Sequence, residues 1–106
     1  RLLVERVRQV LADHPQQGRN ADALAAWLNM SPRTLHRQLH EEGASLQTLK
    51  DSVRQQRAQE LLLRTHRPLK QIAEQVGFAN EKSFIRAFRA WTGMTPDAFR
   101  NGPQQA

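Results

Sequence analysis

A short pattern occurs twice along this chain of 106 residues, and this duplication restricts the possible folds more than any other feature. Each copy opens with three apolar residues at helical spacing, and the two sets lie 48 positions apart. They are Leu24, Ala25 and Leu28 in the first copy and Ile72, Ala73 and Val76 in the second. The segments 31–39 and 80–88 then match at an offset of 49, so the second copy has one more residue in its turn. A repeat of this length indicates that each copy is one supersecondary unit.

Each copy has the pattern of a helix, a short turn and a second helix with a marked start. Apolar residues recur at helical spacing throughout the chain, and the alternating runs typical of strands are missing. Ser31 followed by Pro32 is a strong start signal, because Ser accepts from free N–H groups and Pro has none to lose. Asn80 occupies the same place in the second copy. The sequence therefore predicts two helix-turn-helix units.

A long helix is predicted between the two copies, over residues 45–65. Its apolar residues gather at both ends, while residues 54–57 in its middle are polar. This distribution is typical of a helix that joins two small cores. We therefore expect an all-α chain, with seven helices forming two helix-turn-helix subdomains joined by a long linker helix. The expected bounds are 1–44 for the first subdomain, 45–65 for the linker helix and 66–106 for the second, with a loop at 14–18.

The balance of charge indicates a polyanionic partner. The formal net charge is +6, and the pI is near 11.3. Residues 1–53 hold seven basic and six acidic residues, whereas residues 54–106 hold nine and four. Double-stranded DNA is the first candidate. The alternative is a helical interaction module in which the 45–65 helix binds an acidic protein or an anionic membrane surface. Binding to a membrane requires a continuous apolar stripe, which residues 55–57 interrupt.

The exposed face of each second helix follows from its buried face, because a helix turns about 100° per residue. The predicted outward residues are Arg33, Arg37 and His40 with His36 beside them in the first copy, and Lys82, Arg86 and Arg89 with Ile85 beside them in the second. A guanidinium group donates two parallel hydrogen bonds to guanine, which makes Arg33, Arg37 and Arg86 the leading candidates for reading bases. Ile85 suits a thymine methyl group, and His36 suits a base or a phosphate.

Phosphate contacts are expected from helix starts and from nearby cations. Ser31 and Asn80 lie at predicted helix N-termini, where free N–H groups favour a phosphate. The remaining candidates are basic residues on or near the helices: Arg54, Arg57, Lys70 and Arg89. The competing interpretation is that these side chains are only solvated and that Ser31 and Asn80 serve only as caps.

The length of the linker helix suits duplex DNA. About 20 residues at 1.5 Å each span roughly 30 Å, and successive major-groove segments on one face of B-DNA lie about 34 Å apart. Two recognition helices in one chain are therefore expected to enter successive major-groove segments of a non-palindromic site of about 20 base pairs.

Catalytic and metal-dependent functions find little support. The chain has no Cys, which excludes disulfides and thiolate metal sites, and it has no Gly-rich phosphate loop or nucleophile elbow. His36 and His40 are one helical turn apart but lack the further ligands that zinc requires. We therefore expect no enzymatic activity, no metal and no cofactor.

The remaining features concern location and packing. No apolar run approaches the roughly 18 residues of a membrane helix and no signal peptide is visible, so a cytoplasmic location away from membranes is expected. The chain begins at Arg1 inside a helical pattern, which suggests a piece of a longer protein. Trp27 and Trp91 lie on or beside apolar stripes and are expected in the core.

Several stretches resemble the signature of the AraC/XylS-type bacterial transcription regulators. In the second half they are Arg57, Ala58, Leu61 and Leu62, the run from Leu69 to Phe78, Ser83, Phe84, Arg86, Ala87 and Phe88, and the run from Thr92 to Pro96. In the first half, Leu24, Ala25 and the run from Met30 to Leu35 resemble the first helix-turn-helix of the family. The resemblance covers about residues 3–101.

The resemblance implies a seven-helix DNA-binding domain, C-terminal to an effector-binding or dimerisation domain that is absent here, with RNA polymerase as a further partner. The base-contacting positions that it implies are Arg33, His36 and Arg37 in the first unit and Glu81, Lys82, Ser83, Ile85 and Arg86 in the second. Glu81 and Ser83 come from the resemblance alone. Asn29 departs from the family, where Gly is common, and Leu39 replaces a frequent Phe. Because Asn tolerates a left-handed backbone, the turn is expected to survive.

Overall fold

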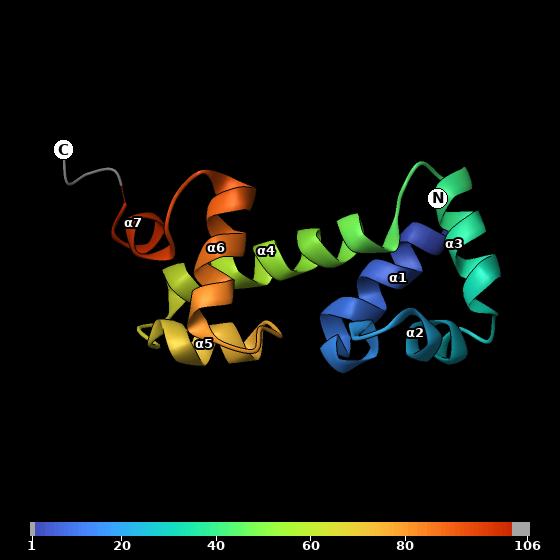
Figure 1. Ribbon diagram of the computed structural model, residues 1–106, viewed down its shortest axis with the longest axis horizontal. Helices are drawn as coiled ribbons and strands as arrows, with labels where there is room; N and C mark the ends of the chain where they lie inside the picture. Colours follow the sequence, from blue (N-terminus) through green and yellow to red (C-terminus); the bar gives the residue numbers. More distant parts are fainter. Residues whose placement is uncertain (1, 103–106) are drawn as a thin grey trace. The chain divides into compact units, whose positions relative to one another are not determined.

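The computed structural model describes residues 2–102, which form seven α-helices and one short 3-10 helix (Figure 1). The helices are α1 Leu2–Asp13, η1 Pro15–Gly18, α2 Ala21–Trp27, α3 Pro32–Glu41, α4 Leu46–Arg64, α5 Leu69–Gln75, α6 Glu81–Thr92 and α7 Pro96–Asn101. No strand occurs in the described residues, and the prediction of an all-α fold is confirmed. The expected loop at 14–18 is wrong in one respect, because residues 15–18 close into the turn of η1, with Pro15 fixing its first position.

Side chains cap the starts of α2, α3 and α6, and the caps of Ser31 and Asn80 are those that the sequence predicts. In each case a side-chain oxygen accepts from the backbone N–H three residues further along. The distances are 2.7 Å for Asn20 at α2, 3.1 Å for Ser31 at α3 and 2.8 Å for Asn80 at α6. Each such cap stabilises a helix start by about 1 kcal/mol. The local sequence therefore defines where α2, α3 and α6 begin.

The turn between α2 and α3 is closed by backbone hydrogen bonds and a left-handed residue. Asn29 has φ +59° and donates its N–H to the Ala26 carbonyl at 3.1 Å. The Met30 N–H donates to the Ala25 carbonyl at 2.9 Å. This pair of bonds is the Schellman arrangement that satisfies the last carbonyl groups of a helix. The expectation that Asn29 supports the turn is confirmed.

The turn between α5 and α6 closes in the same way. Gly77 has φ +94° and donates to the Glu74 carbonyl at 3.1 Å, and the Phe78 N–H donates to the Ala73 carbonyl at 2.8 Å. The second turn reaches its cap one residue later than the first, as the repeat predicts. The duplication seen in the sequence is therefore present in the hydrogen bonds of both turns.

The chain divides between Val53 and Arg54 into two compact units, each with its own core. The first core consists of Leu3, Val4, Val7, Leu11, Leu24, Ala25, Leu28, Leu35, Leu39, Leu46 and Leu49, and the second of Ala58, Leu62, Ile72, Ala73, Val76, Phe84 and Phe88. Each fully buried Leu or Phe contributes about 1.5–3 kcal/mol to folding. The finer division into 1–44, 45–65 and 66–106 stays a prediction, and residues 1 and 103–106 lie outside the described residues.

In the first unit, a carboxylate at the end of α3 caps the start of α1. The Glu42 carboxylate accepts from the backbone N–H groups of Val4 at 3.0 Å and Leu3 at 3.2 Å. The Val4 hydrogen bond lowers the pKa of Glu42 below its ordinary value of 4.5, with a smaller contribution from Leu3. This contact connects the end of α3 to the start of α1.

In the second unit, a guanidinium group caps the end of α4. Arg100 on α7 donates through Nε to the Leu62 carbonyl at 3.0 Å and through Nη2 to the Thr65 carbonyl at 3.3 Å. The last carbonyl groups of a helix have no partner within it, and a cation is favourable there. Arg100 thereby connects α7 to the C-terminal end of α4 within the second unit.

Trp27 corrects an expectation, because it is not a core residue. Its side chain is 48% exposed, and its ring lies 4.8 Å from that of His14 in a tilted arrangement. The buried face of α2 is formed by Leu24, Ala25 and Leu28, and Trp27 falls beside that face. Trp91, by contrast, packs against the second core as expected.

Candidate nucleic-acid interface

The outer face of α3 carries the cations that its inner face predicts. Leu35 and Leu39 are fully buried. The predicted outward residues are all exposed: Arg33, His36, Arg37 and His40. The hydrophobic core therefore fixes the orientation of α3, and its basic side chains remain available to a partner.

A single intrahelical ion pair modifies this face. Arg37 donates through Nη1 to the Glu41 carboxylate at 3.3 Å, and the two side chains are 57% and 60% exposed. Exposed pairs of this i,i+4 type contribute about 0.3–0.5 kcal/mol. Such a pair is weak enough for Arg37 to exchange Glu41 for a nucleic-acid acceptor.

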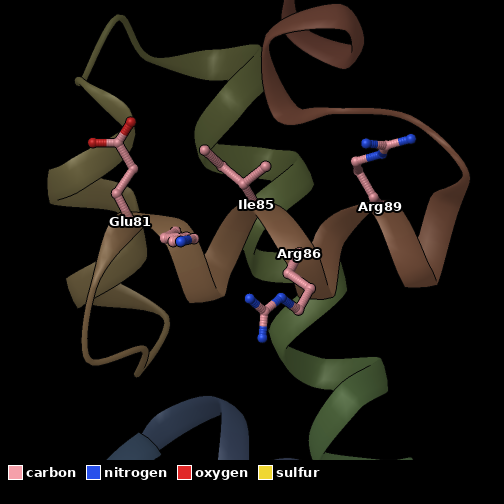
Figure 2. A pocket seen from close by; sticks show the side chains of 5 residues that line it. Glu81, Ile85, Arg86 and Arg89 are labelled. Carbon is pink, nitrogen blue, oxygen red and sulfur yellow. The ribbon is translucent and has the colours of Figure 1, made fainter.

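The outer face of α6 combines charge of both signs with an apolar side chain. Phe84 and Phe88 are fully buried, whereas Ser83 and the charged residues of the outer face are exposed. Five side chains line an open hollow on this face: Glu81, Lys82, Ile85, Arg86 and Arg89. Figure 2 shows Glu81 at the start of the helix and Arg89 two turns further along, with Ile85 and Arg86 between them. A carboxylate, a branched apolar group and guanidinium groups on one face are the groups that distinguish base edges in the major groove.

The predicted phosphate-contacting residues lie in different surroundings. Ser31 and Asn80 are exposed at the starts of α3 and α6, and their side-chain oxygens already cap those helices. Arg57, Lys70 and Arg89 are exposed. All five remain in positions from which a phosphate could be bound.

Arg54 has a role within the protein that the sequence pattern did not indicate. Its guanidinium group donates to the carbonyl oxygens of Val76 at 3.2 Å and Gly77 at 2.8 Å. It also lies over the ring of Phe78, 4.2 Å from the ring centroid. These contacts connect α4 to the turn that precedes α6.

Sequence reasoning missed several tertiary contacts of charged side chains in the described residues, among them those of Glu42, Arg54 and Arg100. Each of these three joins residues 22 to 39 positions apart. Arg54 lies in the middle of α4 and Arg100 lies on α7, whereas the carbonyl groups that they bind belong to the ends of other helices. No local signal marks these contacts, which follow only from the tertiary fold.

Two further properties bear on the kind of ligand. In residues 2–102, no group of three or more His, Asp or Glu side chains converges on a point where a metal ion could bind. None of the helices in that range has both the length and the apolar character of a membrane span.

Comparison with known proteins agrees with this architecture. The family described as "Helix-turn-helix domain" matches residues 24–102. The ornithine utilization regulator of Pseudomonas aeruginosa is 38% identical over 101 residues, which cover 95% of this chain and 30% of that protein. The HTH-type transcriptional regulator VqsM of the same organism is 35% identical over 99 residues, covering 93% of this chain and 30% of that protein. The chain thus spans about 30% of the length of these relatives.

Solved structures share the fold. A DNA-binding transcriptional dual regulator from Escherichia coli K-12 superposes with a TM-score of 0.89 at 30% identity, covering 98% of this chain and 94% of that one. The DNA-binding domain of AdpA, a global transcriptional factor solved in complex with a target DNA, gives a TM-score of 0.79 at 28% identity, with coverage of 92% and 89%. These proteins are transcription regulators rather than enzymes. The chain therefore belongs to the AraC-type family of helix-turn-helix transcription regulators and is a DNA-binding domain of that family.

Proposed function

We propose that this domain reads a specific, non-palindromic DNA site of about 20 base pairs, with α3 and α6 as recognition helices in successive major-groove segments. The observation that carries the proposal is the exposed cationic face on the second helix of each unit, in two units whose turns are closed by the same pair of backbone hydrogen bonds. The 19 residues of α4 correspond to about 28 Å of helix, which is close to the spacing of those groove segments.

Base reading is assigned to the outer faces of both recognition helices. In the first unit, Arg33 and Arg37 suit guanine, and His36 donates to a base or a phosphate. In the second unit, the residues are Glu81, Lys82, Ser83, Ile85 and Arg86. Arg86 and Lys82 suit guanine, Ile85 suits a thymine methyl group, and Glu81 suits the amino group of cytosine. Each good bidentate contact discriminates by about 1–3 kcal/mol.

Phosphate binding is assigned to the helix starts and to three exposed cations. Ser31 and Asn80 lie where helix N-termini favour an anion. Arg57, Lys70 and Arg89 add charge on the exposed surface. Arg54 is not assigned to a phosphate, because its guanidinium group donates to carbonyl oxygens of the turn between α5 and α6.

Further partners follow from the relatives. Because the chain spans about 30% of the length of two curated relatives, we propose that an N-terminal effector-binding or dimerisation domain accompanies it in the full protein. RNA polymerase is a second proposed partner, since a promoter-bound regulator acts on transcription. A regulator of bacterial promoters works in the cytoplasm, where the DNA is.

The test is selection of bound duplexes from a pool randomised over about 25 base pairs, a length that holds two half-sites one helical turn apart. The experiment is done near physiological salt, because phosphate binding dominates at low salt. Two enriched blocks would support the proposal. A single enriched block would indicate that the second unit binds only the DNA backbone. No enrichment would contradict sequence-specific reading.

Two variants distinguish a residue that contacts bases from one that contacts phosphates. Arg37→Ala is expected to relax base preference at one position of the first block, whereas Arg57→Ala is expected to weaken binding of all duplexes alike. Arg64→Gln is the matched control, because it removes one exposed charge of α4 that has no assigned contact. Uniform weakening by Arg37→Ala would make Arg37 a phosphate contact.

A further inference from the structure

The guanidinium group of Arg54 lies on the turn that leads into α6. Its Nη2 donates to the Gly77 carbonyl at 2.8 Å and its Nε to the Val76 carbonyl at 3.2 Å. The Val76 oxygen lies at the C-cap of α5, where carbonyl groups have no partner within the helix, and the Gly77 oxygen lies one residue beyond it in the turn. A planar cation that donates two hydrogen bonds suits such a helix end in both charge and geometry.

The same side chain also reaches the aromatic residues against which α6 packs. The guanidinium carbon lies 4.2 Å from the centroid of the Phe78 ring. Phe78 in turn lies 5.7 Å from Phe84 and 5.9 Å from Trp91, measured between ring centroids. Both of these residues belong to α6. Arg54 therefore contacts the backbone of the turn and the side chain that joins the turn to α6.

The second turn has a particular need for such an anchor. It runs from the helix end at Val76 to the cap at Asn80, whereas the first runs from Leu28 to Ser31 and is one residue shorter. A longer turn has more backbone freedom to lose on ordering. Gly77, which has no side chain, adds to that freedom.

We propose that Arg54 is a positioning residue for base reading by α6. It holds the turn between α5 and α6, so that Glu81, Lys82 and Arg86 meet the base edges in one register. Hydrogen bonds to bases need side chains held within about 0.5 Å of the productive geometry. The inference rests on the proposed function of α6, and in it Arg54 itself touches no base.

The first test measures the turn in the free protein by amide hydrogen exchange. Arg54→Gln is expected to accelerate exchange of the Gly77 and Phe78 amides about tenfold or more, as expected for loss of charge-assisted hydrogen bonds. Arg54→Lys keeps the charge but loses the planar fork, so its effect should be intermediate. The exchange rates of the matching amides in the first turn, Asn29 and Met30, should be unchanged. In Arg64→Gln, the exchange rates of all four turn amides should be unchanged.

Two outcomes of this test would overturn the anchoring role. One is equal exchange of the turn amides in every variant. The other is an equal acceleration of the Phe88 amide, which lies in the second core and reports unfolding of the whole unit. Arg54→Lys keeps the test decisive if Arg54→Gln does not fold.

The second test repeats the duplex selection with Arg54→Lys and Arg64→Gln. Arg54→Lys should reduce enrichment of the second block about tenfold relative to the first, the loss equivalent to one mispositioned bidentate contact. A second block that stays intact, or an equal loss in both blocks, would overturn the positioning role. A wild-type domain that enriches no second block would instead refute base reading by α6, and the exchange rates alone would then decide whether Arg54 holds the turn.

Discussion

Replacement of Asn29 by Ala should destabilise the first unit by about 1 kcal/mol, because a side chain with a Cβ pays a steric penalty in the left-handed region. Asn29 has φ +59°, and it occupies the position where the chain turns from α2 towards α3. Asn enters this conformation more readily than Ala does, since its short polar side chain bonds locally. At an exposed position inside a helix, by contrast, Asn→Ala would stabilise the helix, because Ala has the higher helix propensity.

The magnitude follows from what the substitution leaves in place. The Asn29 side chain is exposed, so little packing is lost. The two hydrogen bonds that close the turn, at 3.1 and 2.9 Å, are backbone bonds that Ala retains. The conformational penalty is therefore the main change. For a domain of about 100 residues, about 1 kcal/mol corresponds to a fall in Tm of about 4–8 °C.

Thermal unfolding followed by circular dichroism measures this effect, with Asn29→Gly as the matched control. Gly adopts a positive φ without strain, so its Tm should stay close to that of the wild type. Gly77→Ala, at φ +94°, should also lower the Tm, because a Cβ is strained in that backbone conformation. Space is not the cause, since the added Cβ would lie at an ordinary contact distance of 3.5 Å from Nη2 of Arg54. Equal Tm values for Asn29→Ala and Asn29→Gly would refute the left-handed turn.

Three further predictions concern side chains outside the turns. The pKa of Glu42 lies below 4.5 in the folded state. The contribution of its carboxylate to folding stability is therefore complete above pH 4.5 and is lost as the pH falls through the pKa of the folded state. The Tm difference between wild type and Glu42→Gln should therefore narrow between pH 7 and pH 3, and a constant difference would contradict the cap. Trp27→Ala should remove a ring contact of about 0.5–1.5 kcal/mol and the packing of a half-exposed side chain, and unfolding of the whole unit in calorimetry would show that Trp27 is a core residue after all. Glu41→Gln releases Arg37 from a pair of about 0.3–0.5 kcal/mol, so affinity for the selected duplex should rise up to about twofold in a titration, whereas weaker binding would contradict this.

Features encoded over a few residues were predictable from the sequence. Ser31 and Asn80 cap their helices because the acceptor and its N–H partner are three residues apart. The exposed faces of α3 and α6 followed from the spacing of their buried residues. Which of the exposed side chains touch bases stays a prediction, because exposure is necessary for contact but does not establish it.

Contacts between distant parts of the chain were not predictable. Glu42 binds the start of α1 across 38 and 39 positions, and Arg54 binds the second turn across 22 and 23. Periodicity assigned Trp27 to the core, and this assignment was wrong. A residue beside an apolar stripe is buried only if a neighbouring element covers it. Such coverage depends on the tertiary fold, which the spacing of residues does not contain.

The guanidinium groups that close helix ends also affect how salt should act on DNA binding. Affinity falls with the logarithm of salt concentration at a slope set by the number of phosphates that the protein neutralises, because each releases a condensed counterion. Arg54 and Arg100 direct their charge at carbonyl oxygens within the second unit. Since these hydrogen bonds hold both groups on the protein, neither group is assigned a direct phosphate contact, and neither is expected to add to the slope. The salt slope should therefore depend on the basic residues exposed around α3 and α6, and it should fall short of what the full set of 16 Lys and Arg residues would give.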